Sequence, residues 1–105
     1  MEFKDIIKRA VSIRELYAQF ENRTGRTWTR EEIALGFVGD VGELVKLIMA
    51  AEGIRAIPDA KTKLTHELAD CLWSILILAR LYDVDIETAF LRTMDELEAH
   101  IKARL

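Results

Sequence analysis

Two stretches decide the fold of this chain: residues 39–49, GDVGELVKLIM, and residues 66–78, HELADCLWSILIL. Each is apolar over most of its length and carries two acidic side chains at positions i and i+3. The pairs are Asp40 with Glu43 and Glu67 with Asp70. Residues three apart share one face of a helix. We therefore expect two helices, each with an acidic spot set in a surface that is otherwise suited to burial.

Helical patterns extend outward from these stretches over nearly the whole chain, and we find no alternating pattern of a β-strand. Apolar residues that recur every three or four positions predict amphipathic helices. Thr29 with Glu32 forms a capping box before one helix, and Asp85 can cap another. The expected helices cover residues 2–20, 30–52, 60–82 and 86–104. Because the connections are short, we predict an all-α four-helix bundle with antiparallel neighbours, in a single domain over residues 1–105.

Three glycines recur every third position within the expected second helix: Gly36, Gly39 and Gly42. Glycine destabilises a helix by about 1 kcal/mol relative to alanine. Glycines in this pattern therefore predict the close approach of another helix or of a ligand.

Composition limits the kinds of partner that the chain can have. The 105 residues are 50% hydrophobic, with a net charge of −3. This apolar content exceeds what one small core would use, so we expect a homo-oligomer. The acidic balance argues against binding to a nucleic-acid polymer. The longest nearly apolar run, residues 71–79, is too short to span a membrane. A single cysteine, Cys71, and a charged N-terminal segment indicate a cytoplasmic protein.

The four carboxylates need partners if the two helices face each other. Lys46 and Lys63 lie near them in the sequence, but two lysines do not balance four acids. An all-carboxylate site favours a hard cation, Mg²⁺ or Mn²⁺, whereas zinc draws histidine and cysteine. His66 precedes Glu67, so the Glu-x-x-His spacing of a di-iron bundle is absent. Magnesium held by carboxylates commonly binds substrate phosphates, which points to phosphoryl or nucleotidyl transfer to water.

Two other interpretations stay open from the residues alone. In the first, the chain is a non-catalytic oligomerisation or regulatory module whose acids pair with Lys46, Lys63 and Arg80. The second concerns Trp28, which can either stack on a nucleobase or cover the end of the bundle. Trp73 is expected in the core or at a subunit interface, and Cys71 as buried filler.

The two acidic segments, FVGDVGEL at residues 37–44 and LTHELADCL at residues 64–72, resemble the MazG-like nucleotide pyrophosphohydrolases. The mark of that family is Glu-x-x-Glu, a spacer, and Glu-x-x-Asp. The segment is most similar to the dCTP pyrophosphatase branch, in which Val-Gly-Glu-Val-Gly-Glu-Leu is typical. Residues 78–85 and the Met-Asp at residues 94–95 also resemble that branch.

The resemblance implies an all-α bundle that works as a dimer or tetramer. It also implies Mg²⁺-dependent hydrolysis of a nucleoside triphosphate to the monophosphate and pyrophosphate, in clean-up of the nucleotide pool. The metal-ligand positions would be those of Asp40, Glu43, Glu67 and Asp70. Glu43 is the candidate for activating the water. Trp28 would lie near the base, and Lys63 is a further candidate for binding the substrate. The related phosphoribosyl-ATP pyrophosphohydrolases are an alternative.

Two places depart from the pattern of the resembled branch. Asp40 stands where the family usually has glutamate, which is one methylene longer. On the last helix, Thr93 and Leu97 hold the places of a lysine and an asparagine that serve phosphates. Arg92 is adjacent and is the candidate substitute for the missing lysine.

Overall fold

The computed structural model describes residues 1–105 and contains four helices and no strand. The helices are α1 (Phe3–Arg23), α2 (Arg30–Ala51), α3 (Ala60–Leu81) and α4 (Ile86–Lys102). The all-α class is therefore confirmed, with helix ends close to those predicted. No helix is both long enough and apolar enough to cross a membrane.

Local capping explains where α2 and α4 begin. The hydroxyl of Thr29 accepts the backbone N–H of Glu32 at 3.1 Å, and the Glu32 carboxylate accepts that of Thr29 at 3.0 Å. Asp85 accepts the N–H of Thr88 at 3.2 Å. Both predicted caps are thus present, and each satisfies an amide that the first turn of a helix leaves unpaired.

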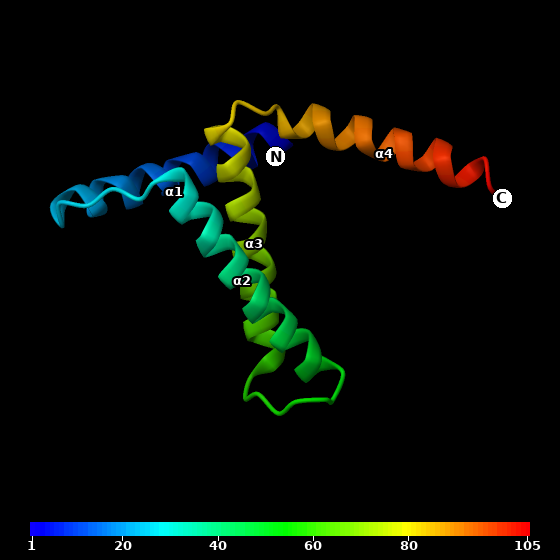
Figure 1. Cartoon of the computed structure of the whole chain (residues 1–105), viewed down its shortest axis with the longest axis horizontal. Coiled ribbons are helices and arrows are strands. Elements are labelled where there is room, and N and C mark those ends of the chain that lie inside the picture. The colour runs from blue at the N-terminus through cyan, green and yellow to red at the C-terminus, as the bar shows by residue number, and fades with distance from the viewer.

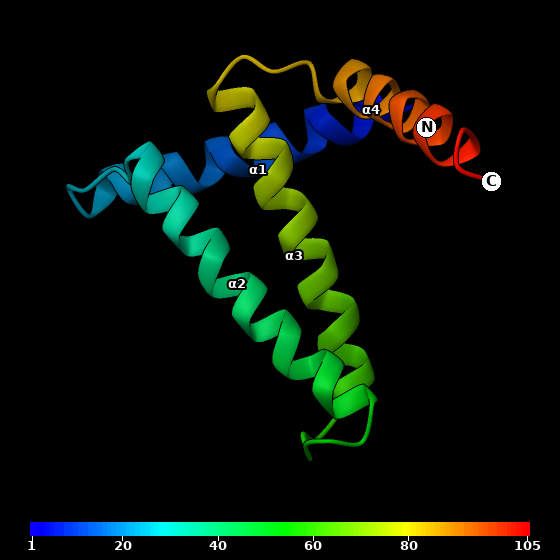
Figure 2. The same cartoon turned by 45° about the vertical axis from the view of Figure 1, so that its right-hand side comes forward.

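Helices α2 and α3 form an antiparallel hairpin, and α1 lies across the end of α3 (Figures 1 and 2). The core is small and lies where α1 meets α3. Its centre is Ala10, Leu76 and Ile77, each at most 7% exposed. Trp73 is half-buried, and its indole N–H donates to the backbone oxygen of Ala10 at 3.1 Å. This bond fixes α1 on α3 because a buried indole N–H requires an acceptor.

Helix α4 extends away from the other three helices (Figure 1). Only its first residue, Ile86, packs against the core. The single chain therefore does not close into the expected four-helix bundle. Helix α4 carries the predicted apolar stripe, but no other part of the chain covers this stripe beyond Ile86. Its exposed members are Phe90, Leu91, Met94, Leu97 and Ile101, which are 39% to 57% accessible.

The chain as a whole leaves an unusual amount of surface open. A packed monomer of this mass exposes about 6,000 Å² and has a radius of gyration of about 13 Å. This chain exposes 8238 Å² and has a radius of gyration of 17.0 Å. Exposed apolar side chains also run along the α2–α3 hairpin: Leu35, Val38, Val41, Val45, Ile48, Leu68, Leu72 and Ile75. A hydrophobic surface of this extent is typical of a protein–protein interface.

The three glycines of α2 differ in what they meet. A Cβ at Gly36 would lie 3.6 Å from the indole of Trp28, which is ordinary van der Waals contact. At Gly39 and Gly42, no atom apart from the adjacent residues and the helix's own backbone lies within 4 Å of such a Cβ. The expected close approach is therefore not made within the single chain at Gly39 or Gly42.

Candidate metal and nucleotide site

The hairpin brings the two acidic pairs into one region. Asp40 and Glu43 come from α2, and Glu67 and Asp70 come from α3. Burial is the main cause that raises the pKa of Glu67. The charges of Asp40, Asp70 and Glu43 raise it further, and His66 lowers it in part. A carboxyl that responds to three others shares their electrostatic surroundings. The four acids therefore share one electrostatic region, called the acidic cluster below, although no three of them lie close enough together to hold an ion.

Among the four acids, Glu67 has a buried carboxylate oxygen, Oε1, that lacks a hydrogen-bond partner. A buried polar atom is normally paired, and leaving a charged one unpaired costs roughly 1–3 kcal/mol or more. This oxygen is positioned to accept a ligand that the chain itself does not supply.

Basic side chains satisfy only half of the cluster. Lys46 binds Glu43 with Nζ and Oε1 3.2 Å apart, and His66 binds Asp70 with Nε2 and Oδ2 also 3.2 Å apart. Asp40 and Glu67 make no ion pair, and neither Lys63 nor Arg80 takes part in one. Of the three cations in the salt-bridge interpretation, only Lys46 is paired with an acid.

The donor set fits a hard cation. No three of the His, Cys, Asp and Glu side chains are close enough together to hold an ion by themselves. Magnesium does not need such a cage, because it is usually bound by one or two carboxylates together with water and substrate phosphates. The carboxylates and the unpaired Glu67 oxygen match that mode of binding.

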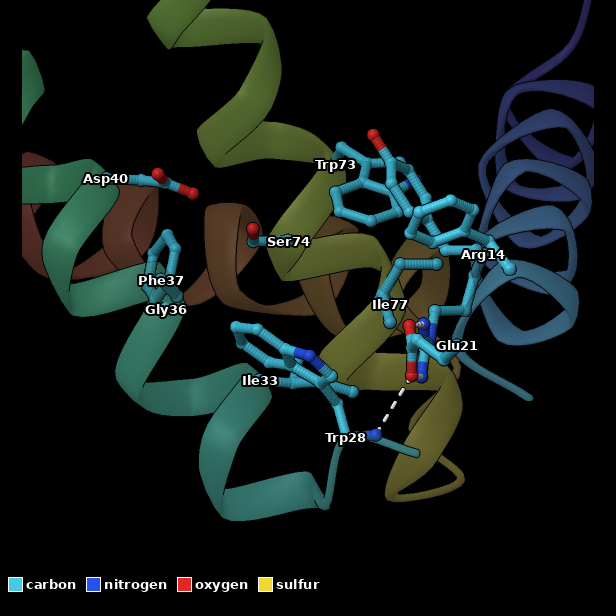
Figure 3. A pocket seen from close by; sticks show the side chains of 12 residues that line it. Arg14, Glu21, Trp28, Ile33, Gly36, Phe37, Asp40, Trp73, Ser74 and Ile77 are labelled. Carbon is cyan, nitrogen blue, oxygen red and sulfur yellow. Dashed lines mark hydrogen bonds and ion pairs between the residues drawn. The ribbon is translucent and has the colours of Figure 1, made fainter. Parts of the chain in front are cut away.

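A cavity of about 420 Å³ lies beside Asp40, between α1, α2 and α3 (Figure 3). Its walls are mainly aromatic and aliphatic, and Tyr17, Phe20 and Trp28 are among the lining residues. Gly36 faces the Trp28 ring, and a larger side chain there would fill space beside it. An apolar cavity with a few polar groups is the usual form of a small-molecule site.

One ion pair holds the Trp28 side of this cavity in place. Arg14 donates to both oxygens of Glu21, at 2.6 and 3.3 Å, and Glu21 also accepts the Trp28 backbone N–H at 2.9 Å (Figure 3). The hydrogen bond from Arg14, followed by that from Trp28, holds the pKa of Glu21 below its ordinary value. This ion pair was not predicted from the sequence. The signal was present, since residues seven apart lie on one face of a helix.

A second cavity, of about 480 Å³, lies on the other side of the acids, near the start of α3. Glu43 and Glu67 border it, as do Lys63 and His66. Lys63 is therefore close to the cluster, as the sequence predicted. Arg92 is not: it is exposed on α4, which extends away from the hairpin (Figure 2).

The structure also shows the positions of Cys71 and Trp73, which the sequence had indicated as buried residues. Cys71 is buried and free, and burial followed by the charge of Glu67 raises the pKa of its thiol. It is therefore not an activated nucleophile, which agrees with a filling role. Trp73 lines the first cavity and also packs against the core, with its ring centroid 5.8 Å from that of Tyr17.

A family comparison agrees with this geometry. Residues 28–104 match the family model described as the MazG nucleotide pyrophosphohydrolase domain. The match covers α2, α3 and α4 and begins at Trp28, so the chain belongs to this family. No curated protein and no solved structure matches the chain. Membership indicates a nucleotide pyrophosphohydrolase with a nucleotide substrate.

Proposed function

We propose that the protein is a Mg²⁺-dependent nucleoside triphosphate pyrophosphohydrolase that releases the nucleoside monophosphate and pyrophosphate. The observation that carries this proposal is the buried, unpaired oxygen of Glu67 among three other carboxylates. In a module held by salt bridges, this oxygen would stay unpaired. In a site for a cation and a polyphosphate, the cation supplies the missing partner of the oxygen.

In this proposal Asp40, Glu43, Glu67 and Asp70 are the candidate metal ligands, and one or two of these carboxylates would hold the ion together with water and the substrate phosphates. The metal would neutralise charge on the phosphates and lower the pKa of a bound water. Glu43 is the solvent-exposed member of the cluster, and it is the group proposed to take the proton of the attacking water. The water oxygen bonds to the α-phosphorus. The bond from that phosphorus to the bridging oxygen breaks, and its electron pair leaves with pyrophosphate.

The first cavity is the proposed place for the nucleoside. It adjoins Asp40, and one of its exposed aromatic side chains, Trp28, can stack on any base. Its volume of about 420 Å³ lies within the range of small-molecule pockets. Stacking alone does not select a base. A deoxycytidine substrate, and a role in clearing the nucleotide pool, rest on the likeness of residues 37–44 to one branch of the family.

The proposal includes a homo-oligomer, a dimer or tetramer, in which the helices of two or more copies complete a bundle. The chain exposes about 2,000 Å² more than a packed monomer would. An obligate interface buries a total of about 2,000–5,000 Å² or more. A second copy that covers the exposed faces of α2, α3 and α4 would account for that excess. Arg92 can take part in phosphate binding only from such a second copy.

A nucleotide panel tests the proposed activity. The protein is incubated with ribo- and deoxyribonucleoside triphosphates and with phosphoribosyl-ATP, each with Mg²⁺ and separately with Mn²⁺. The expected products from at least one triphosphate are pyrophosphate and the monophosphate. Turnover of phosphoribosyl-ATP alone would assign the related activity instead. No pyrophosphate from any substrate would refute the proposal and favour the regulatory module.

A further inference from the structure

The second cavity has a composition unlike that of the first. It is formed by the C-terminal half of α2, Ile57 of the connecting loop and the first turns of α3. Only Leu47 and Ile57 are apolar among its lining residues. It carries no aromatic residue, so it offers no surface on which a base could stack.

The donors of this cavity are not committed to other groups. Lys63 lines it and makes no ion pair, whereas nearby Lys46 is paired with Glu43. The Thr62 hydroxyl also lines it and makes no hydrogen bond within the chain, whereas the Thr65 hydroxyl donates to the backbone of Lys61. Among the basic residues that line either cavity, Arg14 is bound by Glu21 and His66 by Asp70. Lys63 is the one left free.

The backbone at the start of α3 supplies further hydrogen-bond donors. Thr62 and Lys63 belong to the first turn of α3, which contains no acidic residue. Asp59, the N-cap, has a left-handed backbone and makes no side-chain cap hydrogen bond. No side-chain hydrogen bond therefore satisfies the first amides of α3. Because Glu43 and Glu67 line the same cavity as Lys63, a phosphate group would bind there together with a cation on the acids, with Lys63 and the free amides as donors.

The acids separate the two cavities. Asp40 borders the first cavity, and Glu43 and Glu67 border the second. A triphosphate whose base occupied the aromatic cavity would place its α-phosphate beside the acids and its β- and γ-phosphates in the cavity of Lys63.

We propose that the cavity formed by Thr62, Lys63 and His66 is the subsite for the pyrophosphate leaving group. This assignment rests on the proposed function, and it adds the direction in which the substrate lies along the α2–α3 hairpin. Lys63 and Thr62 donate to the phosphate oxygens, and the lysine balances the charge that collects on pyrophosphate as the bond to the α-phosphorus breaks. His66 lies at the rim, next to Asp70.

The test measures the binding of the two products separately. Inorganic pyrophosphate and a nucleoside monophosphate are titrated into the full chain by calorimetry at one fixed concentration of free Mg²⁺. Charge-assisted hydrogen bonds predict that Lys63→Met weakens pyrophosphate binding about tenfold or more. Binding of the monophosphate should stay within about twofold. Lys63→Arg should retain most of the affinity, and Thr62→Val should weaken pyrophosphate alone.

Lys61→Met is the matched control, because Lys61 is exposed in the same turn but does not line the cavity. Trp28→Leu should show the reverse pattern, with weaker monophosphate and unchanged pyrophosphate. The inference is overturned if wild type does not bind pyrophosphate, if Lys63→Met leaves its affinity unchanged, or if Lys63→Met weakens both products equally. These outcomes differ from failure of the proposed function, which is the absence of pyrophosphate release in the nucleotide panel.

Discussion

Replacing Glu67 by glutamine should stabilise the metal-free protein and also remove its response to magnesium. The substitution keeps the shape of the side chain and removes one negative charge. In the wild type, that charge has a buried oxygen without a partner and three carboxylates nearby. An amide in the same place has no like-charge repulsion and is cheaper to bury. Most substitutions at a partly buried position destabilise a protein, so the expected direction is distinctive.

The magnitudes follow from the unpaired charge and from binding linkage. Relief of an unpaired charge is worth about 1 kcal/mol or more, and each kcal/mol moves the melting temperature of a domain this size by about 4–8 °C. Metal-free Glu67→Gln should therefore melt at least about 4 °C above metal-free wild type. A ligand at one hundred times its Kd stabilises the native state by about 2.7 kcal/mol. Saturating Mg²⁺ should thus raise the wild-type melting temperature by about 10–20 °C and leave that of Glu67→Gln unchanged.

The assay is thermal unfolding in chelator and in Mg²⁺, at one protein concentration, because the melting temperature of an oligomer depends on concentration. Glu15→Gln is the control, since Glu15 is exposed on α1 and makes no ion pair. It should change neither value appreciably. If metal-free Glu67→Gln melts below wild type, Glu67 makes a stabilising contact and the account of its charge is wrong. If the magnesium response persists in the variant, Glu67 is not a metal ligand.

Three further substitutions probe other parts of the account. Glu21→Gln should loosen the Trp28 side of the first cavity. Because the pKa of Glu21 is lowered, its stabilisation is present above about pH 4.5 and is lost as the pH falls below that value. Wild type should thus lose more stability than Glu21→Gln between pH 7 and pH 3 in thermal melts, and equal losses would contradict this. Val38→Asp, on the exposed face of α2 (66% accessible), should shift the mass by light scattering toward the monomer; an unchanged mass would place the interface elsewhere. Thr29→Ala removes the α2 cap and should cost about 1 kcal/mol of unfolding free energy in urea, whereas no loss would mean that the cap does not contribute.

Local features of the fold were predictable because they depend on neighbouring residues. The Thr29 capping box and the Asp85 cap follow from short-range hydrogen bonding, and the structure contains both. The clustering of the four acids was also predictable, because two adjacent helices joined by a short connection pack antiparallel. The degree of burial and the partners of each acid could not be predicted. Spacing shows which side chains share a face, but it does not show that the Glu67 oxygen is buried while Glu43 is exposed.

Features that depend on distant contacts were missed or left open. The periodicity of α4 showed that one face is apolar, but it did not show that the face has no partner in its own chain. The hydrogen bond from Trp28 to Glu21 depends on how the loop after α1 returns to that helix. The second cavity requires the position of Ile57 in the α2–α3 loop, which no periodic pattern specifies.

The central claim is that water attacks the α-phosphorus at the acidic cluster and that pyrophosphate leaves. Hydrolysis of a turned-over triphosphate in ¹⁸O-labelled water, followed by mass spectrometry of both products, tests this directly. Attack at the α-phosphorus should give one labelled oxygen in the nucleoside monophosphate and none in pyrophosphate. Label in pyrophosphate, or release of inorganic phosphate in place of pyrophosphate, would contradict it.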